Sequence, residues 1–245
     1  MSQALVWISG ASSGIGKALA DAVPWDNARV IDISRSGAAG LEHVEADLSD
    51  PASWPAVAQS FERELRDFSG DVAVFVHAAG TIEPIGYAGE VEGDAYASAV
   101  VLNSAAPQAL GRAFLSAAAD VDAVRHIVML TSGAATSVYP GWSSYGAGKA
   151  AVDQWVRNAG AEQDERGGVR VISITPGTVD TAMQERIRET SERDFPKRSK
   201  FVDLHERGEL ADPDDVARQI WELLAQELDN GSVVDLRELA SAAEE

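Results

Sequence analysis

The chain of 245 residues contains no cysteine and only four histidines. Without cysteine it can form no disulfide framework, no thiolate metal site and no cysteine nucleophile. His43, His77, His126 and His205 are scattered along the sequence, and no two stand at the spacing that places two metal ligands on one helix face. We therefore expect no metal site in this protein.

Long apolar runs and clustered positive charge are also scarce. No apolar stretch approaches the roughly 20 residues that a membrane-spanning helix needs, and residues 1–5 lack the basic flank of a signal peptide. We expect a cytoplasmic protein without a membrane partner. The net charge of -19 would repel phosphate backbones, and only residues 193–200 gather several cations, so we expect no nucleic-acid partner. An anionic cofactor held by local backbone amides remains compatible with this diffuse charge.

The sequence does contain a regular alternation of short apolar runs and helical patterns. Hydrophobic residues make up 45% and charged residues 24% of the chain, and its length suits one α/β domain, which we expect over residues 1–245. Alternating strands and helices predict a doubly wound parallel sheet of about seven strands, with helices on both faces. The runs that predict strands cover residues 5–8, 28–34, 45–48, 71–77, 124–130, 169–174 and 232–236.

The first predicted strand ends at a glycine-rich turn over residues 9–16. Gly10, Gly14 and Gly16 allow a sharp turn and let a pyrophosphate approach backbone amides at a helix N-terminus, where the helix dipole favours negative charge. Many strand-to-helix turns contain glycine for conformational reasons alone. The position directly after the first strand favours a nucleotide site.

The end of the second predicted strand bears on the choice of cofactor. In dinucleotide-binding folds an acidic residue there favours a free ribose 2′-hydroxyl, whereas an arginine favours a 2′-phosphate. Ser34 and Arg35 therefore favour NADP(H). Asp32 lies two residues upstream on the same strand face as Ser34, which leaves NAD(H) as the alternative and Arg35 as an ordinary surface arginine.

Later strand ends carry further candidates for cofactor binding. Asp47 can accept a hydrogen bond from an adenine amino group, or it can cap the following turn. Residues 78–80 are small, so the backbone there can lie flat against a cofactor. Polar residues and glycines recur after the next strands, at the edge where open parallel sheets bind ligands.

A long helical pattern from residue 94 to residue 119 contains Asn103 and Pro107. Proline has no N–H to donate to the carbonyl four residues earlier, so Pro107 leaves the Asn103 carbonyl without its helical partner and bends the helix. The freed carbonyl can bind a water molecule. A proline kink without functional meaning is the other interpretation.

Tyr145 and Lys149 are four residues apart in a predicted helix, a spacing that places the ammonium above the phenol on one face. A free tyrosine ionises near about pH 10 and is a poor acid or base at neutral pH unless a nearby cation stabilises the phenolate. The pair is therefore a candidate catalytic unit, and a chance pair on a solvated helix face is the alternative.

These features together resemble the short-chain dehydrogenase/reductase superfamily over almost the whole chain. Its TGxxxGxG motif matches residues 9–16, its NNAG motif residues 77–80 and its PGxVxT motif residues 176–181. The catalytic tetrad of that superfamily matches Asn103, Ser132, Tyr145 and Lys149. The resemblance implies a Rossmann-type fold and a nicotinamide cofactor.

Two positions depart from these motifs. Ser9 replaces the threonine and keeps its hydroxyl, whereas His77 and Ala78 replace the paired asparagines. The second change removes both side-chain amides that would tie this loop to its neighbours.

A narrower resemblance, to the sepiapterin reductase and benzil reductase branch, rests on residues 141–151, 180–190 and 208–212. It implies NADPH-dependent reduction of a ketone or dicarbonyl compound to an alcohol. In sepiapterin reductase a C-terminal aspartate anchors the pterin, and Asp235 falls at the matching place.

The resemblance also implies a role for each tetrad residue. Ser132 would hold the substrate carbonyl while Tyr145 donates a proton to the alkoxide. Lys149 would lower the pKa of Tyr145 and hold the ribose hydroxyls, and a water on the Asn103 carbonyl would connect Lys149 to solvent. The expected cofactor residues are Gly10, Ser12, Ser13, Gly14, Ile15, Gly16, Ser34, Arg35, Asp47, Leu48, Ala78, Ala79, Gly80, Tyr145, Lys149, Pro176, Gly177, Val179 and Thr181. The expected substrate residues are Ser132, Trp142, Tyr145, Met183, Phe201 and Asp235.

Other readings of the same sequence stay open. A catalytically silent NADP-binding regulator and an NAD-dependent alcohol dehydrogenase would share this fold, whereas a sugar-nucleotide epimerase would need a larger substrate domain than the residues after Thr181 supply. The charged segment 182–208 is either a substrate lid or a solvated helical hairpin. The resemblance implies a homo-oligomer, a dimer or tetramer packed through the helix over residues 94–119 and the helix of Tyr145.

Overall fold

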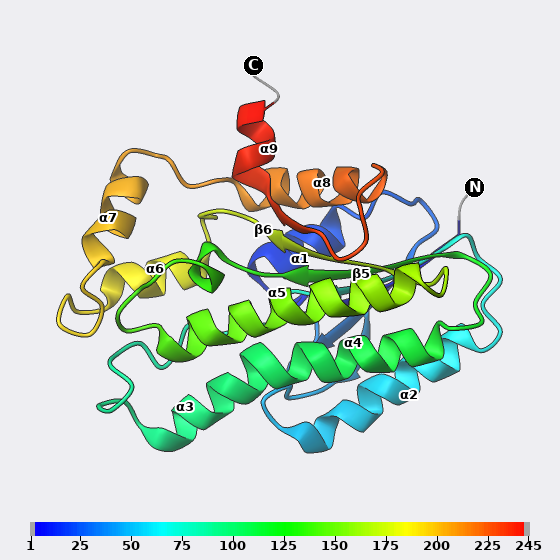
Figure 1. The fold of residues 1–245 in the computed structure, drawn as a ribbon, viewed down its shortest axis with the longest axis horizontal. Helices are drawn as coiled ribbons and strands as arrows, with labels where there is room; N and C mark the ends of the chain where they lie inside the picture. Colours follow the sequence, from blue (N-terminus) through cyan, green and yellow to red (C-terminus); the bar gives the residue numbers. More distant parts are fainter. Residues whose placement is uncertain (1–2, 243–245) are drawn as a thin grey trace.

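A computed structural model describes residues 3–242 of the chain (Figure 1). One seven-stranded sheet runs in the order β3-β2-β1-β4-β5-β6-β7, and every neighbouring pair is parallel. The strands are β1 (Ala4–Ser9), β2 (Arg29–Ser34), β3 (Glu42–Glu45), β4 (Val72–His77), β5 (Val124–Leu130), β6 (Arg170–Thr175) and β7 (Val233–Asp235). The predicted α/β class, with its doubly wound parallel sheet, is confirmed.

Helices cover both faces of the sheet, because side chains of alternate strand residues point to opposite faces. On one face, Trp7 and Phe75 pack with residues of α2 (Trp54–Leu65), α4 (Ala106–Ala117) and α5 (Ser143–Asp164). On the other face, Val6 and Val74 pack with residues of α1 (Gly14–Asp21) and α8 (Pro213–Leu224). Both faces of the central strands are buried, which explains their continuous apolar runs.

The long helix predicted over residues 94–119 consists of three segments. It comprises α3 (Gly93–Val100), a π-helical segment η2 (Val101–Ala105) and α4. Pro107 stands in the first turn of α4, where its missing N–H is tolerated. The interruption is therefore a one-turn widening around Asn103 that comes before the proline.

The charged segment 182–208 contains two short helices, α6 (Ala182–Glu189) and α7 (Arg198–Glu206), which stand beyond one end of the sheet in Figure 1. Phe195 and Phe201 are buried and pack against Trp142 at the start of α5. The segment is therefore anchored by an apolar cluster, in contrast to a fully solvated hairpin. The last helix, α9 (Leu236–Ala242), follows β7 directly and was not predicted.

Within residues 3–242, no helix is long and apolar enough to cross a membrane. The same residues contain no group of three or more histidines, cysteines or acidic residues placed to hold a metal ion.

Candidate active site

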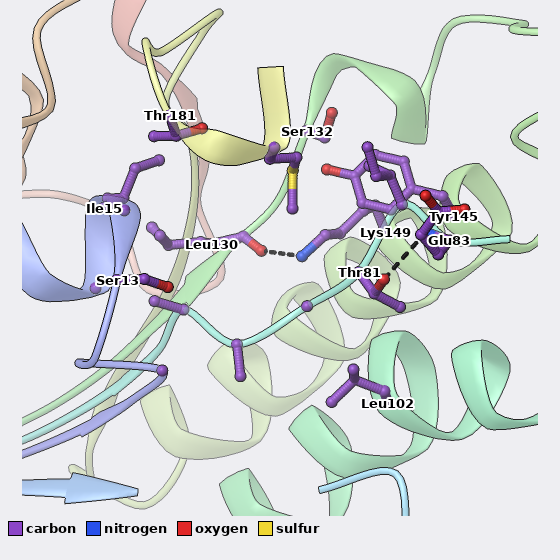
Figure 2. A pocket seen from close by; sticks show the side chains of 18 of the residues that line it. Ser13, Ile15, Thr81, Glu83, Leu102, Leu130, Ser132, Tyr145, Lys149 and Thr181 are labelled. Carbon is purple, nitrogen blue, oxygen red and sulfur yellow. Dashed lines mark hydrogen bonds between the residues drawn. The ribbon is translucent and has the colours of Figure 1, made fainter. Parts of the chain in front are cut away.

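A cavity of about 640 Å³ opens at the carboxyl ends of β1 to β6. The turns that follow these strands form its walls, as the strand-end pattern predicts. All nineteen residues expected to bind the cofactor line this cavity, and so do Ser132, Trp142, Met183 and Phe201. Figure 2 shows the catalytic end, with Ser132, Tyr145 and Lys149 on one side and Ser13 and Ile15 of the glycine-rich turn on the other.

The glycine-rich turn after β1 is built for a close approach of a ligand to the backbone. Gly10 has a positive φ of 76°, and α1 begins at Gly14 without a side chain capping its first amides. A Cβ on Gly16 would lie 2.2 Å from the Gly10 carbonyl oxygen, so no other residue fits there. The open helix N-terminus offers donors and a positive dipole end to a pyrophosphate, so these residues fit a dinucleotide cofactor.

The loop after β4 is tied down without the two asparagines of the family motif. The Ser9 hydroxyl accepts from the Ala78 and Ala79 backbone N–H groups, each at 3.1 Å, and lies 3.1 Å from His77 Nδ1. His77 is buried, and desolvation lowers its pKa to about 3, so the ring is neutral at pH 7. One hydroxyl thus replaces the anchoring expected from both amides.

The end of β2 separates Asp32 from the cofactor cavity. Asp32 is fully buried and accepts hydrogen bonds from the Ala11 N–H at 3.1 Å and the Ser34 hydroxyl at 2.6 Å. Its carboxylate therefore supports the glycine-rich turn from behind. Ser34 and Arg35 line the cavity itself, whereas Asp32 does not.

Asp47 lies at the same end of the cavity. Hydrogen bonds from Ser49 are the main cause that lowers its pKa, and the positive charge of Arg35 adds to the effect. The Ser49 hydroxyl and N–H both donate to Asp47 Oδ1. The capping role considered from the sequence is therefore present, while the residue still lines the cavity.

Asn103 sits in η2, buried, behind the cavity wall. Its side-chain Oδ1 accepts from the Thr81 N–H at 3.0 Å, and its Nδ2 donates to the Thr81 carbonyl at 2.8 Å. The backbone carbonyl of Asn103 packs close to Gly148 on α5, where a Cβ would lie 3.3 Å from that oxygen. The sequence predicted a role for the backbone carbonyl of Asn103, whereas the structure shows its side chain bound to the loop beside the cavity.

Tyr145 and Lys149 lie on one buried face of α5, as their spacing predicts (Figure 2). The Lys149 ammonium is 5.8 Å from the centroid of the Tyr145 ring and donates to the Leu130 carbonyl at 2.8 Å. Burial raises the pKa of Tyr145 above its ordinary value of 10.0, and a hydrogen bond with the Ser132 side chain lowers it only in part. In this arrangement burial outweighs the lowering expected from Lys149.

The buried lysine has an electrostatic environment of its own. Desolvation lowers the pKa of Lys149 to about 8, and the Asp153 charge opposes that shift. Asp153 is buried one turn further along α5 and accepts a hydrogen bond from the Ser173 hydroxyl at 3.0 Å. Burial raises the pKa of Asp153.

An aromatic cluster forms the wall beside Tyr145. Trp142 packs against Phe195 at 4.5 Å and against Tyr145 at 5.3 Å between ring centroids, and Phe201 and Tyr139 complete the group. Met183 lines the same end of the cavity but is 36% exposed, so it belongs to the rim. Tyr139 and Phe195 were missed from the sequence, because their contacts with Trp142 link separate segments.

Asp235 lies outside the cavity wall, in contrast to its expected role as the substrate anchor. Its carboxylate is paired with Arg237, whose Nε and Nη2 donate at 2.9 and 2.5 Å, and this hydrogen bonding lowers the pKa of Asp235. Arg237 lines the cavity instead. Lys200, Thr81 and Glu83 are further lining residues that sequence reasoning did not name.

Comparison with known proteins agrees with this geometry. The model of the family described as short chain dehydrogenase matches residues 4–192. Benzil reductase ((S)-benzoin forming) of Bacillus subtilis is 34% identical over 94% of this chain and 97% of its own length. Sepiapterin reductase of Rattus norvegicus is 36% identical over 46% of this chain and 42% of its own. The crystal structure of the KRED1-Pglu enzyme superposes with a TM-score of 0.79 at 27% identity, covering 94% of this chain and 99% of that one. The chain therefore belongs to the short-chain dehydrogenase/reductase superfamily, in the branch that contains the benzil and sepiapterin reductases.

Proposed function

We propose that this protein is an NADPH-dependent carbonyl reductase that reduces a ketone or dicarbonyl compound to an alcohol. The observation that carries the proposal is the meeting of Ser132 and Tyr145 with the glycine-rich turn in one cavity. The overall reaction consumes one carbonyl group, one NADPH and one proton, and it yields one alcohol and NADP⁺. The similarity to benzil reductase over nearly the whole chain supports this class of substrate.

In this mechanism the chain positions the carbonyl group and supplies the proton. A nicotinamide cofactor held by the glycine-rich turn would supply the hydride when bound. Ser132 donates a hydrogen bond to the substrate oxygen, and Tyr145 donates its phenolic proton to the same oxygen as negative charge develops there. The raised pKa of Tyr145 keeps the phenol protonated, which is the form that an acid needs.

Lys149 has two tasks in the proposal. It lies beside Gly80 and Tyr145 on the cavity wall, where it can bind ribose hydroxyls and stabilise the phenolate left after proton transfer. The proton that restores Tyr145 would come from solvent, through a water held by the Asn103 carbonyl and then through Lys149. The Asn103 side chain holds the cavity loop in place through its two hydrogen bonds to the Thr81 backbone.

The preference for NADP(H) over NAD(H) rests on the end of β2. Arg35 lines the cavity, whereas the buried Asp32 carboxylate accepts hydrogen bonds from the Ala11 N–H and the Ser34 hydroxyl. An arginine without a competing carboxylate favours a 2′-phosphate. The expected cofactor residues along the wall, from Gly10 to Thr181, would hold the dinucleotide.

Several further expectations belong to the same proposal. Residues 182–208 would act as the lid of the substrate site within a single domain, since α6 and α7 carry Gln184, Ile187 and Phe201 on the cavity. The functional unit would be a cytoplasmic dimer or tetramer.

The test is oxidation of NADPH, followed optically, with sepiapterin, benzil, diacetyl and simple aldehydes. Reduction of benzil or another dicarbonyl by NADPH, with slower turnover by NADH, is the expected result. Tight NADPH binding with no turnover across the panel would favour a catalytically silent regulator instead.

A further inference from the structure

Arg237 is held in a fixed position beside the catalytic end of the cavity. It is the second residue of α9, and its backbone N–H and its guanidinium both donate to Asp235. Its Nη2 lies 3.6 Å from the site of a Cβ on Gly133, and its Cδ lies 3.3 Å from that of Gly177. The guanidinium thus sits between the turns after β5 and β6, next to Ser132, and both glycines line the cavity with it.

A second cation reaches the same region from α7. Lys200 Nζ donates to the Tyr139 hydroxyl at 2.9 Å and lies 5.7 Å from the centroid of the Phe201 ring. Lys200, Tyr139 and Arg237 all line the cavity, so two cations from distant parts of the chain reach it together.

The acidic groups near these cations are already satisfied. Glu83 is the acidic lining residue at this end, and its carboxylate pairs with Arg186 and accepts from the Ile85 N–H. Asp47, the other acidic residue that lines the cavity, lies at the Arg35 end. Four cations line the cavity, namely Arg35, Lys149, Lys200 and Arg237, against these two carboxylates and the Asp235 carboxylate that pairs with Arg237 from outside the wall. In a chain of net charge -19 this is a local excess of positive charge.

The apolar wall beside these cations also carries an unused donor. The Trp142 indole N–H is buried and has no hydrogen-bond partner within the described part of the chain. The rings of Trp142, Phe195 and Phe201 provide an apolar surface of aromatic size next to Tyr145.

We propose that the substrate is a keto acid, whose carboxylate is held by Arg237 and Lys200 while its oxo group meets Ser132 and Tyr145. Guanidinium and ammonium groups recognise carboxylates through charge-assisted hydrogen bonds. The rest of the molecule is apolar and packs on the aromatic cluster. This inference rests on the proposed function and adds the charge of the substrate to it.

The first experiment compares two probes, benzoylformate and its methyl ester, which differ in charge and by one methyl group, with NADPH as reductant. The wild-type protein should show a kcat/KM for the acid at least about tenfold higher than for the ester at low salt. That advantage should shrink as sodium chloride is raised, because exposed charges are screened beyond about 10 Å at 0.1 M ionic strength. An ester reduced as well as the acid would overturn the proposal.

Variants then test the two cations. Arg237→Gln should lower the ratio of acid to ester kcat/KM at least about tenfold, mainly through KM for the acid, and Lys200→Gln should lower it several-fold. Because Arg237→Gln leaves Asp235 unpaired, the double variant Asp235→Asn/Arg237→Gln separates loss of the cation from exposure of the carboxylate. Arg207→Gln is the matched control, since Arg207 also lies at α7, pairs with Glu209 and does not line the cavity. An unchanged ratio in both cavity variants would overturn the assignment.

Failure of the proposed function would look different. In that case neither probe, nor benzil or diacetyl, would be reduced. Calorimetric titration of mandelate, the corresponding hydroxy acid, into the NADP-loaded protein then still decides the inference. Binding that weakens at least about tenfold in Arg237→Gln supports a carboxylate site, and equal or absent binding in both proteins refutes it.

Discussion

The side-chain amide of Asn103 makes two hydrogen bonds to the backbone of Thr81. Its Oδ1 accepts from the Thr81 N–H at 3.0 Å, and its Nδ2 donates to the Thr81 carbonyl at 2.8 Å. The two residues are 22 positions apart, and Thr81 lines the cavity one residue after Gly80. The amide thus fixes the loop after β4 against the helix that carries it. We call this pair of hydrogen bonds the Asn103 clamp. Gly148 packs against the same asparagine, so the clamp also contacts α5, the helix that carries Tyr145 and Lys149.

Asn103→Ala should lower the free energy of unfolding by about 1–3 kcal/mol, since two partly buried backbone groups of Thr81 lose their partners. Turnover should fall with it, because the loop borders the cofactor cavity. Urea unfolding and NADPH oxidation measure the two effects. Gln108→Ala removes a hydrogen bond to the Ser104 carbonyl on the neighbouring turn and should cost less. Equal losses in the two variants would refute the clamp.

Tyr145→Phe should reduce kcat by at least about two orders of magnitude, the usual loss when a positioned acid is removed. NADPH should still bind, because the ring and the Lys149 amine remain; fluorescence titration checks this. Tyr87→Phe is the control, since Tyr87 is 42% exposed and lies off the cavity. Turnover close to that of the wild type in Tyr145→Phe would remove Tyr145 from the mechanism.

Arg35→Ala should lower kcat/KM for NADPH by at least about tenfold and leave that for NADH within about twofold, because only NADPH carries the 2′-phosphate that a charged donor would hold. Steady-state kinetics with both cofactors give the ratio. Arg66→Ala removes the same charge from the exposed end of α2 and should change neither value. Equal losses with both cofactors would argue that Arg35 does not select NADP.

Gly16→Ala should destabilise the fold by about 1–3 kcal/mol and weaken NADPH binding, because the added Cβ would lie 2.2 Å from the Gly10 carbonyl oxygen. Thermal unfolding with and without NADPH measures both consequences. Gly93→Ala places the same methyl group where nothing lies within 4 Å and should be neutral or slightly stabilising. If Gly16→Ala had as little effect as Gly93→Ala, the close contact between Gly16 and the Gly10 carbonyl oxygen would be contradicted.

His77 should make the protein sensitive to acid. Its pKa falls from 6.5 to about 3 on folding, so between these pH values the unfolded chain binds more protons and stability decreases as pH decreases. At pH 5 the loss from this residue is about 2 kcal/mol. Relative to His77→Asn, the wild type should therefore lose stability between pH 7 and pH 5 in urea titrations. His205→Asn, at an exposed position of α7, should follow the wild type. Parallel pH profiles for wild type and His77→Asn would contradict the buried neutral ring.

Much of the catalytic end could be predicted from the sequence because its signals are local. The Tyr145–Lys149 spacing places both side chains on one helix face whatever surrounds the helix. Gly10 and Gly14 indicate a turn, and both adopt the positive φ values that glycine adopts readily. Strand ends of a parallel sheet converge at one edge, so the residues after them were expected in one cavity, and they line one.

Other features depend on contacts between segments that no local pattern links. Whether Asp32 faces a ribose or supports Ala11 is decided by how the turn folds back over β2. Asp235 pairs with Arg237, which belongs to helix α9, and the sequence pattern did not predict that helix. The Asn103 side chain bonds to Thr81, which lies in a different segment of the chain.

What the sequence by itself determined is the order of strands and helices, the glycine-rich turn after the first strand, and the placement of Tyr145 and Lys149 on one helix face. Periodicity and backbone preference act over a few residues, so they can be read along the chain. Only the tertiary structure decided which charges are buried, paired or left facing the cavity, because burial and pairing arise from packing between distant segments. That is why Arg237 and Lys200 became visible as partners for a substrate only in the folded molecule.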